Sequence, residues 1–284
     1  FFFLVTPYNE LHRSLHFLLI FPIFLFLLFL QACIGYVELG TDSWIINIMQ
    51  YVIAGDAFLL FIYTSALMFV LRFFAGPIVH RINPMGLLFA SAVLATIGLF
   101  MLGSVATGAA ILVAATIYGI GKTFFWPTML AVVSERFPKG GALTLGAVGG
   151  IGMLSAGLLG GPGIGYKQDY FTTEVVRQEN PAIYQEYVSD NEQGFLFFSK
   201  TEGMDGAKVG VLLAKDPSEL TPTQARERAA LQDASIRGGQ TALRWTALVP
   251  LTLAVSYLIL LFYFRAQGGY RALELEEEAK GTAS

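Results

Sequence analysis

Long apolar runs separated by short polar breaks dominate this chain. Six windows of mostly apolar residues reach the length of about 20 residues that a helix needs to cross a bilayer. The first stays apolar from near Leu15 through Val37 and, after a polar patch, continues with a second apolar stretch to Ile53. The others cover residues 57–75, 85–104, 108–133, 142–165 and 241–264. Few charges lie inside them, so the pattern predicts transmembrane helices rather than buried helices of a soluble domain.

Composition supports a membrane protein and argues against several other classes. Only 14% of the residues are charged, whereas soluble domains have about 25%. Cys33 is the single cysteine, which excludes a disulfide framework and a cysteine-based metal site. The sequence has no Walker, HExxH or GxSxG motif. We therefore predict no enzyme, no catalytic residue, no metal and no cofactor.

One polar stretch, residues 167–240, interrupts the apolar pattern and is expected to be a partly helical insert. Thr221 is a suitable N-cap, Pro222 a suitable first helical residue, and Gly238 a helix stop. Apolar residues at 195–199 predict either a short strand or a plug against the outer mouth. Residues 266–284 are acidic and read as a solvated cytoplasmic tail.

Basic residues are distributed unevenly between the predicted connections. If the N-terminus is cytoplasmic, the short outer connections 38–56 and 105–107 hold no Lys or Arg, and the insert lies outside. The short cytoplasmic segments then contain Arg13, Arg72, Arg81, Arg136, Lys139, Arg265 and Arg271. The positive-inside rule therefore favours cytoplasmic termini, in a cell (inner) membrane.

The fourth apolar segment carries a lysine near its middle. An ammonium at that depth costs at least about 2.5–3.5 kcal/mol unless it meets water or a partner. Tyr118, Lys122 and Trp126 are spaced by four residues and share a helix face. Pro127 frees the carbonyl of Thr123 and predicts a bend there. Such a face suits a polar solute, and structural pairing of the lysine with packing aromatics is the alternative.

The first segment contains two carboxylates four residues apart. Glu38 and Asp42 are expected on one side of the helix, with Trp44 and Asn47 nearby. Burial disfavours the charged form of a carboxylate, which suits a proton-coupling group. If the helix begins near Leu18, Glu38 reaches the outer surface, and if it begins near Phe24, Glu38 stays inside. Asp42 is either a site residue or a helix cap.

The fifth segment is rich in glycine and is expected to be a packing helix. Small residues at spacings of three to four let neighbouring helices approach closely. The glycines are Gly146, Gly149, Gly150, Gly152, Gly157, Gly160 and Gly161.

The stretch "RFFAGPIVHRINP", residues 72–84, resembles the loop motif of the major facilitator superfamily. That motif has an Arg, a Gly four places later, then three residues and Asp-Arg; Arg72, Gly76 and Arg81 match, while His80 replaces the Asp. "GKTFFWPTMLAVVSERFP" and "GALTLGAVGGIGMLSAGLLGGPGIG" resemble the family's tenth and eleventh helices. The narrower pattern is similar to the proton symporters for fucose, glucose and galactose.

The resemblance implies an all-α membrane protein with six transmembrane helices, the second half of a twelve-helix transporter. Residues 1–14 would end the central linker, 15–166 would be helices seven to eleven, and 241–265 helix twelve. The implied function is secondary active transport of a small polar solute, such as a sugar, coupled to protons. The implied partner is an N-terminal six-helix half. A non-transporting scaffold or receptor that acts through the insert is the alternative.

The predicted orientation can be tested by labelling cysteines with an impermeant thiol reagent. In a Cys33→Ala background, His80→Cys should react only when the cytoplasmic face is open to the reagent, while Asp190→Cys in the insert should react from outside. Labelling of position 80 from outside would overturn the orientation.

Overall fold

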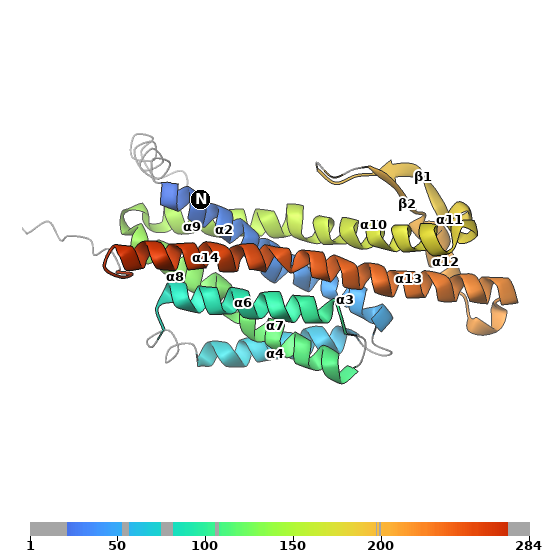
Figure 1. The fold of residues 1–284 in the computed structure, drawn as a ribbon, viewed down its shortest axis with the longest axis horizontal. Helices are drawn as coiled ribbons and strands as arrows, with labels where there is room; N and C mark the ends of the chain where they lie inside the picture. The colour runs from blue at the N-terminus through green and yellow to red at the C-terminus, as the bar shows by residue number, and fades with distance from the viewer. Residues whose placement is uncertain are drawn as a thin grey trace, which may run out of the picture.

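The computed structural model of the protein describes residues 22–52, 57–74, 82–105, 108–196, 198 and 200–271. The described chain folds into an elongated bundle of helices, with a smaller lobe at one end (Figure 1). The helical elements of the bundle are α2 (Pro22–Gly35), the π-helix η2 (Tyr36–Gly40), α3 (Thr41–Val52), α4 (Ala57–Phe73), α6 (Pro84–Leu102), α7 (Gly108–Thr123), α8 (Phe125–Arg136), the short turn η3 (Pro138–Gly140), α9 (Gly141–Ser155), the π-helix η4 (Ala156–Gly160), α10 (Gly161–Glu179), α13 (Pro222–Thr246) and α14 (Leu248–Ala266).

Several of these elements follow one another directly, so the described residues form six helical rods. The composite rods are α2–η2–α3, α7–α8, α9–η4–α10 and α13–α14. Among the described residues, five rods have the length and apolar character needed to cross a membrane, and the sixth, Ala57–Phe73, is apolar but shorter. The six apolar windows of the sequence therefore correspond to the six rods.

Proline and a capping residue set two of the helix boundaries. The rod α7–α8 is interrupted at Phe124, three residues before Pro127, as expected for a proline that removes one backbone hydrogen bond. At the start of α6, the side chain of Asn83 accepts a hydrogen bond from the backbone N–H of Met85 at 2.8 Å. Asn83 is thus an N-cap, with Pro84 in the first turn.

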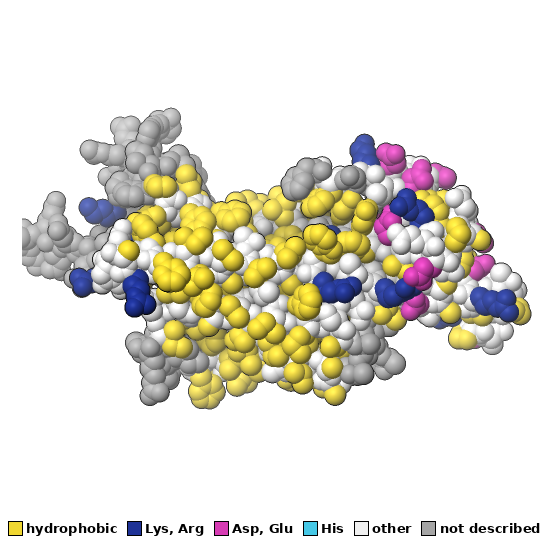
Figure 2. Space-filling model, in the orientation of Figure 1, with side chains coloured by type: hydrophobic (Ala, Val, Ile, Leu, Met, Phe, Trp, Pro, Cys, Tyr) yellow, Lys and Arg dark blue, Asp and Glu magenta, His cyan; other side chains and the backbone are white. Residues whose placement is uncertain are grey.

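The hydrophobic core runs along the whole bundle. In it, α6 packs against α7 and α14, α2 packs against α9, and α4 packs against α7. The surface is largely apolar over the length of the bundle, and charged side chains gather towards its two ends (Figure 2). This distribution fits a bundle whose middle contacts lipid or protein and whose ends contact water.

The lobe at the end of the bundle is formed by residues 181–219, the central part of the polar stretch 167–240, whose two ends belong to α10 and α13. It consists of α11 (Pro181–Tyr187), the antiparallel strands β1 (Val188–Gln193) and β2 (Thr201–Met204), α12 (Gly206–Ala214) and the turn η5 (Pro217–Glu219). The strands pair Val188 with Met204 and Gln193 with Thr201. A small core joins the lobe to α10 and α13; its buried residues are Val176, Tyr187, Met204, Leu212, Leu231 and Ala234.

A buried hydrogen bond between α11 and α13 lies within this small core. The hydroxyl of Tyr187 donates a hydrogen bond to the Glu227 carboxylate at 2.9 Å. Burial of the phenol raises the pKa of Tyr187 to about 12, and the hydrogen bond to Glu227 is the second cause of this rise. The phenol therefore keeps its proton, and the hydrogen bond persists, throughout the physiological pH range.

The structure contradicts the expected helix stop at Gly238 and, of the two alternatives for residues 195–199, the strand. Thr221 is the N-cap of α13, with a complete capping box to Gln224, but Gly238 does not end the helix, which continues to Thr246. A Cβ at Gly238 would lie 2.2 Å from Oγ1 of Thr172, so this glycine permits close packing of α13 on α10. Phe195, Leu196 and Phe198 are not part of a strand but lie in the connection between β1 and β2.

The first and fifth rods approach each other closely at two pairs of glycines, one of them between the π-helical turns η2 and η4. A Cβ at Gly40 would lie 2.6 Å from the Cα of Gly160, and a Cβ at Gly35 would lie 2.0 Å from the carbonyl oxygen of Gly152. The sequence correctly indicated a packing role for Gly152 and Gly160, but a Cβ at Gly146, Gly149, Gly150 or Gly157 would meet no atom within 4 Å.

We expect Gly40→Ala to lower the thermal unfolding midpoint of the protein in detergent. The added methyl collides with backbone rather than with a mobile side chain, and overpacking of this kind costs about 1–3 kcal/mol. Gly210→Ala, in a helix where a Cβ meets nothing within 4 Å, is the control and should leave the midpoint unchanged or raise it slightly. Equal midpoints for both variants would contradict the proposed importance of this crossing.

Candidate solute and ion site

Lys122 and Asp42 form an ion pair in the middle of the bundle. The ammonium of Lys122 donates a hydrogen bond to Oδ1 of Asp42, across from α7 to α3. The lysine side chain is fully buried, whereas 19% of the Asp42 side chain is exposed. Asp42 therefore serves as the partner of a buried cation rather than as a helix cap, because α3 continues directly from η2.

A second ion pair lies beside the first. Arg72 of α4 donates from its guanidinium to Oε1 of Glu38 at 3.2 Å. Its Nε also donates to the carbonyl of Thr123 at 3.4 Å. That carbonyl is the one left without a helical donor by Pro127. The interruption of α7–α8 thus creates an acceptor for the arginine that holds Glu38.

The Glu38 carboxylate and the Lys122 ammonium both lie near the middle of the described parts of their rods. Glu38 is 16 residues from Pro22 and 14 from Val52, and Lys122 is 14 residues from each end of its rod at Gly108 and Arg136. At 1.5 Å per residue, each is about 21 Å from the end of its rod nearest the insert. Glu38 is only 3% exposed.

Tyr118 and Trp126 differ from the expectation that both face a solute together with Lys122. Tyr118 is fully buried, its hydroxyl donates to the carbonyl of Val37 at 2.7 Å, and the Lys122 ammonium lies 5.2 Å from the centre of its ring. Tyr118 is therefore a packing and hydrogen-bonding residue here. Trp126 follows the interruption at Phe124, and its half-buried ring packs against Gly152 of α9.

Trp44 lies apart from the two ion pairs. Its indole N–H donates to the side-chain oxygen of Gln168 in α10 at 2.5 Å. With Asn47, it lines a cavity beside the insert. The structure thus brings together Glu38, Asp42 and Lys122 and assigns Trp44 to a different place.

The loop motif is only partly within the described residues. Gly76 and Arg81 lie outside them. Arg72 is described, but its guanidinium contacts Glu38 and Thr123 rather than serving only as a cytoplasmic charge of the loop. Arg72 therefore belongs to the central charged cluster, a role that the sequence analysis did not give it.

Gln31 is a further candidate that the sequence analysis missed. It is fully buried, and neither its amide nitrogen nor its amide oxygen has a hydrogen-bond partner among the described residues. The amide lies next to the Trp126 ring over Gly152. Its signal in the sequence was a lone amide within the apolar run "FLFLLFLQACIG".

A comparison with solved structures finds a likeness to a transporter. The structure of a bacterial homologue of the human lysosomal transporter Spinster, in an inward-facing and occupied conformation, matches the chain with a TM-score of 0.63 and 14% sequence identity. The match covers 89% of this chain and 51% of that chain, so the chain spans about half the length of the transporter. No protein-family model matches, and a search of curated proteins finds no match.

The chain shares the helical membrane-protein fold of about half of that transporter. The fold class expected from the sequence is therefore confirmed. At this sequence identity, the likeness extends to the arrangement of the helices and not to the solute. It does not distinguish the symporters for fucose, glucose and galactose from other transporters with this fold.

Removing the buried cation should destabilise the bundle more than removing its whole pair. Lys122→Met leaves the Asp42 carboxylate without its cation, and loss of one partner of a buried pair costs about 3–5 kcal/mol. We expect a lower thermal unfolding midpoint, which Asp42→Asn in the same chain should partly restore. Glu179→Gln, which removes an exposed partner of Arg237, is the control and should not change the midpoint. An unchanged midpoint for Lys122→Met would contradict the pairing.

Proposed function

We propose that this chain is the second half of a secondary active transporter that moves a small polar solute by alternating access. The observation that carries the proposal is the buried Lys122–Asp42 pair beside the Glu38–Arg72 pair, both at the middle of the bundle. Charged groups at this depth are costly and usually mark the path of a solute or an ion. The fold of the chain is consistent with this role.

The two ion pairs supply different parts of the mechanism. In the first, the ammonium of Lys122 is an immobile donor that can exchange Asp42 for a hydroxyl or carboxylate of the solute. In the second, a proton taken up by Glu38 would remove its attraction to Arg72 and release the α4 helix from η2. Coupling then follows because each pair is made in one state and broken in the other.

The missing partner in this proposal is an N-terminal six-helix half. Arg72 has 46% of its side chain exposed although it lies next to a buried carboxylate. Lipid against that guanidinium would be costly, so water or protein must cover this face. Large apolar side chains of α4 and η4, such as Phe69 and Leu158, are exposed as well. A second half would cover both faces and enclose the solute between them.

The first solutes to test are monosaccharides, because the resemblance of the sequence is to symporters for fucose, glucose and galactose. We place the protein in the cell (inner) membrane with both ends of the chain in the cytoplasm. Tyr118 and Trp126 were expected to stack on a sugar. Only the half-buried Trp126 fits that role, because Tyr118 is buried and its hydroxyl donates to the carbonyl of Val37.

The test is uptake by the full-length protein reconstituted in liposomes. With an inward proton gradient, we expect accumulation of labelled solute that a protonophore abolishes. Lys122→Ala should lower uptake at least about 100-fold, because a buried charge-assisted contact contributes about 3 kcal/mol. Glu38→Gln should keep solute exchange at equal concentrations but lose the proton-driven accumulation. Glu179→Gln is the control and should transport normally. Proton-driven accumulation that is normal in both variants would remove the site assignment.

The alternative is a membrane receptor or scaffold that acts through the insert, and the cavity beside the insert is the observation that favours it. Such a protein would tolerate Lys122→Ala and Glu38→Gln, would show no uptake of any solute, and would lose its activity when residues 181–220 are deleted.

A further inference from the structure

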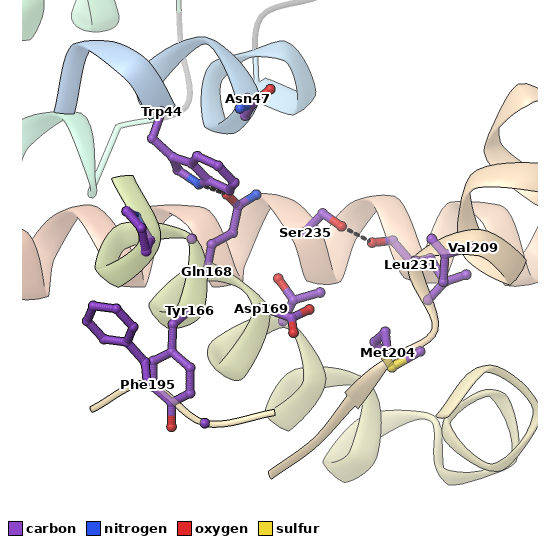
Figure 3. A pocket seen from close by; sticks show the side chains of 15 residues that line it. Trp44, Asn47, Tyr166, Gln168, Asp169, Phe195, Met204, Val209, Leu231 and Ser235 are labelled. Atoms are coloured by element: carbon purple, nitrogen blue, oxygen red, sulfur yellow. Dashed lines mark hydrogen bonds between the residues drawn. The ribbon is translucent and has the colours of Figure 1, made fainter. Parts of the chain in front are cut away.

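A cavity of about 670 Å³ lies where the insert meets the bundle. Its walls come from α3, α10, α13, the segment between the two strands, β2 and α12 (Figure 3). The volume is within the range of sites for small molecules, about 300–1,000 Å³. Residues 42 and 44 are close in the sequence, but Asp42 contacts Lys122 whereas Trp44 lines this cavity. The cavity is therefore distinct from the two central ion pairs.

Asp169 gives the cavity a negative charge. Among the described residues that line it, Asp169 alone carries a formal charge at neutral pH, and no Lys or Arg takes part. The carboxylate is half-buried, and it has neither a hydrogen-bond donor nor a cationic partner within the described part of the chain. The neighbouring Lys167 cannot serve, because its ammonium donates to Thr246 and lies over the Tyr36 ring.

Three aromatic rings accompany this carboxylate: those of Trp44, Tyr166 and Phe195. Trp44 is held by its hydrogen bond to Gln168 and lies against Gly165, where a Cβ would come within 3.0 Å of the indole. Tyr166 and Phe195 have ring centres 6.2 Å apart. Aromatic faces together with one carboxylate are the groups that bind alkylated ammonium ions.

Gly203 of β2 leaves room for the Asp169 carboxylate where the lobe faces α10. A Cβ at Gly203 of β2 would lie 2.6 Å from Oδ2 of Asp169. Phe195 also comes from the connection between the strands, whereas Trp44 belongs to the bundle. The insert thus completes the cavity, which neither the insert nor the bundle forms alone.

We propose that this cavity binds a small organic cation of the quaternary ammonium class, with Asp169 as its counter-ion and the rings of Trp44, Tyr166 and Phe195 around its alkyl groups. The site is independent of the transport proposed above, because binding here requires neither the central ion pairs nor a proton gradient.

Equilibrium dialysis with labelled choline tests the site in the full-length protein in detergent. The comparison ligand is 3,3-dimethylbutanol, which has the shape of choline but no charge. We expect saturable binding of choline and at least about tenfold weaker binding of the neutral alcohol, because only the cation gains the carboxylate and the ring faces.

Variants then assign the binding to this cavity. Asp169→Asn keeps the size of the side chain and should weaken choline binding about tenfold or more, without changing the binding of the neutral alcohol. Trp44→Leu should weaken the binding of both choline and 3,3-dimethylbutanol. Asp190→Asn removes an exposed carboxylate of β1 outside the cavity and should bind choline as the unaltered protein does.

The proposal would be overturned by three results. One is the absence of saturable choline binding to the unaltered protein. The second is equal affinity for choline and 3,3-dimethylbutanol, which would make the cavity a site for neutral molecules. The third is choline binding that survives Asp169→Asn. Because no uptake is measured, loss of transport in liposomes would leave this test unaffected.

Discussion

A fully buried ammonium in the centre of the bundle is the constraint on which the remaining structure depends. Asp42 faces this ammonium from another helix and supplies its counter-charge. That requirement fixes the rotation of α3 against α7 and, with it, the position of Glu38 one turn away. Arg72 then donates both to Oε1 of Glu38 and to the carbonyl exposed by Pro127. Four charges therefore specify how three of the six rods face one another, which apolar packing alone would leave open.

Much of the fold was predictable because hydrocarbon imposes simple rules on a sequence. Six apolar windows of suitable length corresponded to six rods, and Asn83, Thr221 and Pro127 marked helix boundaries by their own chemistry. Gly238 misled the sequence analysis because a glycine that ends a helix and one that admits a neighbouring helix look the same in one dimension. The structure distinguishes the two roles, because a Cβ added at Gly238 would lie only 2.2 Å from Oγ1 of Thr172.

The site was predictable in its residue types but not in its partnerships. Lys122, Glu38 and Asp42 attracted attention because charges are rare in such segments. Which carboxylate meets which cation depends on contacts between residues 34 and 80 positions apart, which no local spacing encodes. The π-helical turn η2 also shifts the helical phase between Glu38 and Trp44. Trp44 accordingly turns to α10, where its indole bonds Gln168, rather than to the Lys122–Asp42 pair.

The rod α13–α14 runs without a loop from Pro222 to Ala266, and backbone hydrogen bonds continue across Ala247. Its 45 residues measure about 67 Å. One part of this rod carries Leu231 and Ser235 in the cavity wall, while the other packs on α6 within the bundle. The rod is interrupted only at Ala247, three residues before Pro250, so its two parts follow each other directly. A molecule bound in the cavity would therefore contact the same helical rod that continues into α14, the last apolar helix of the described chain.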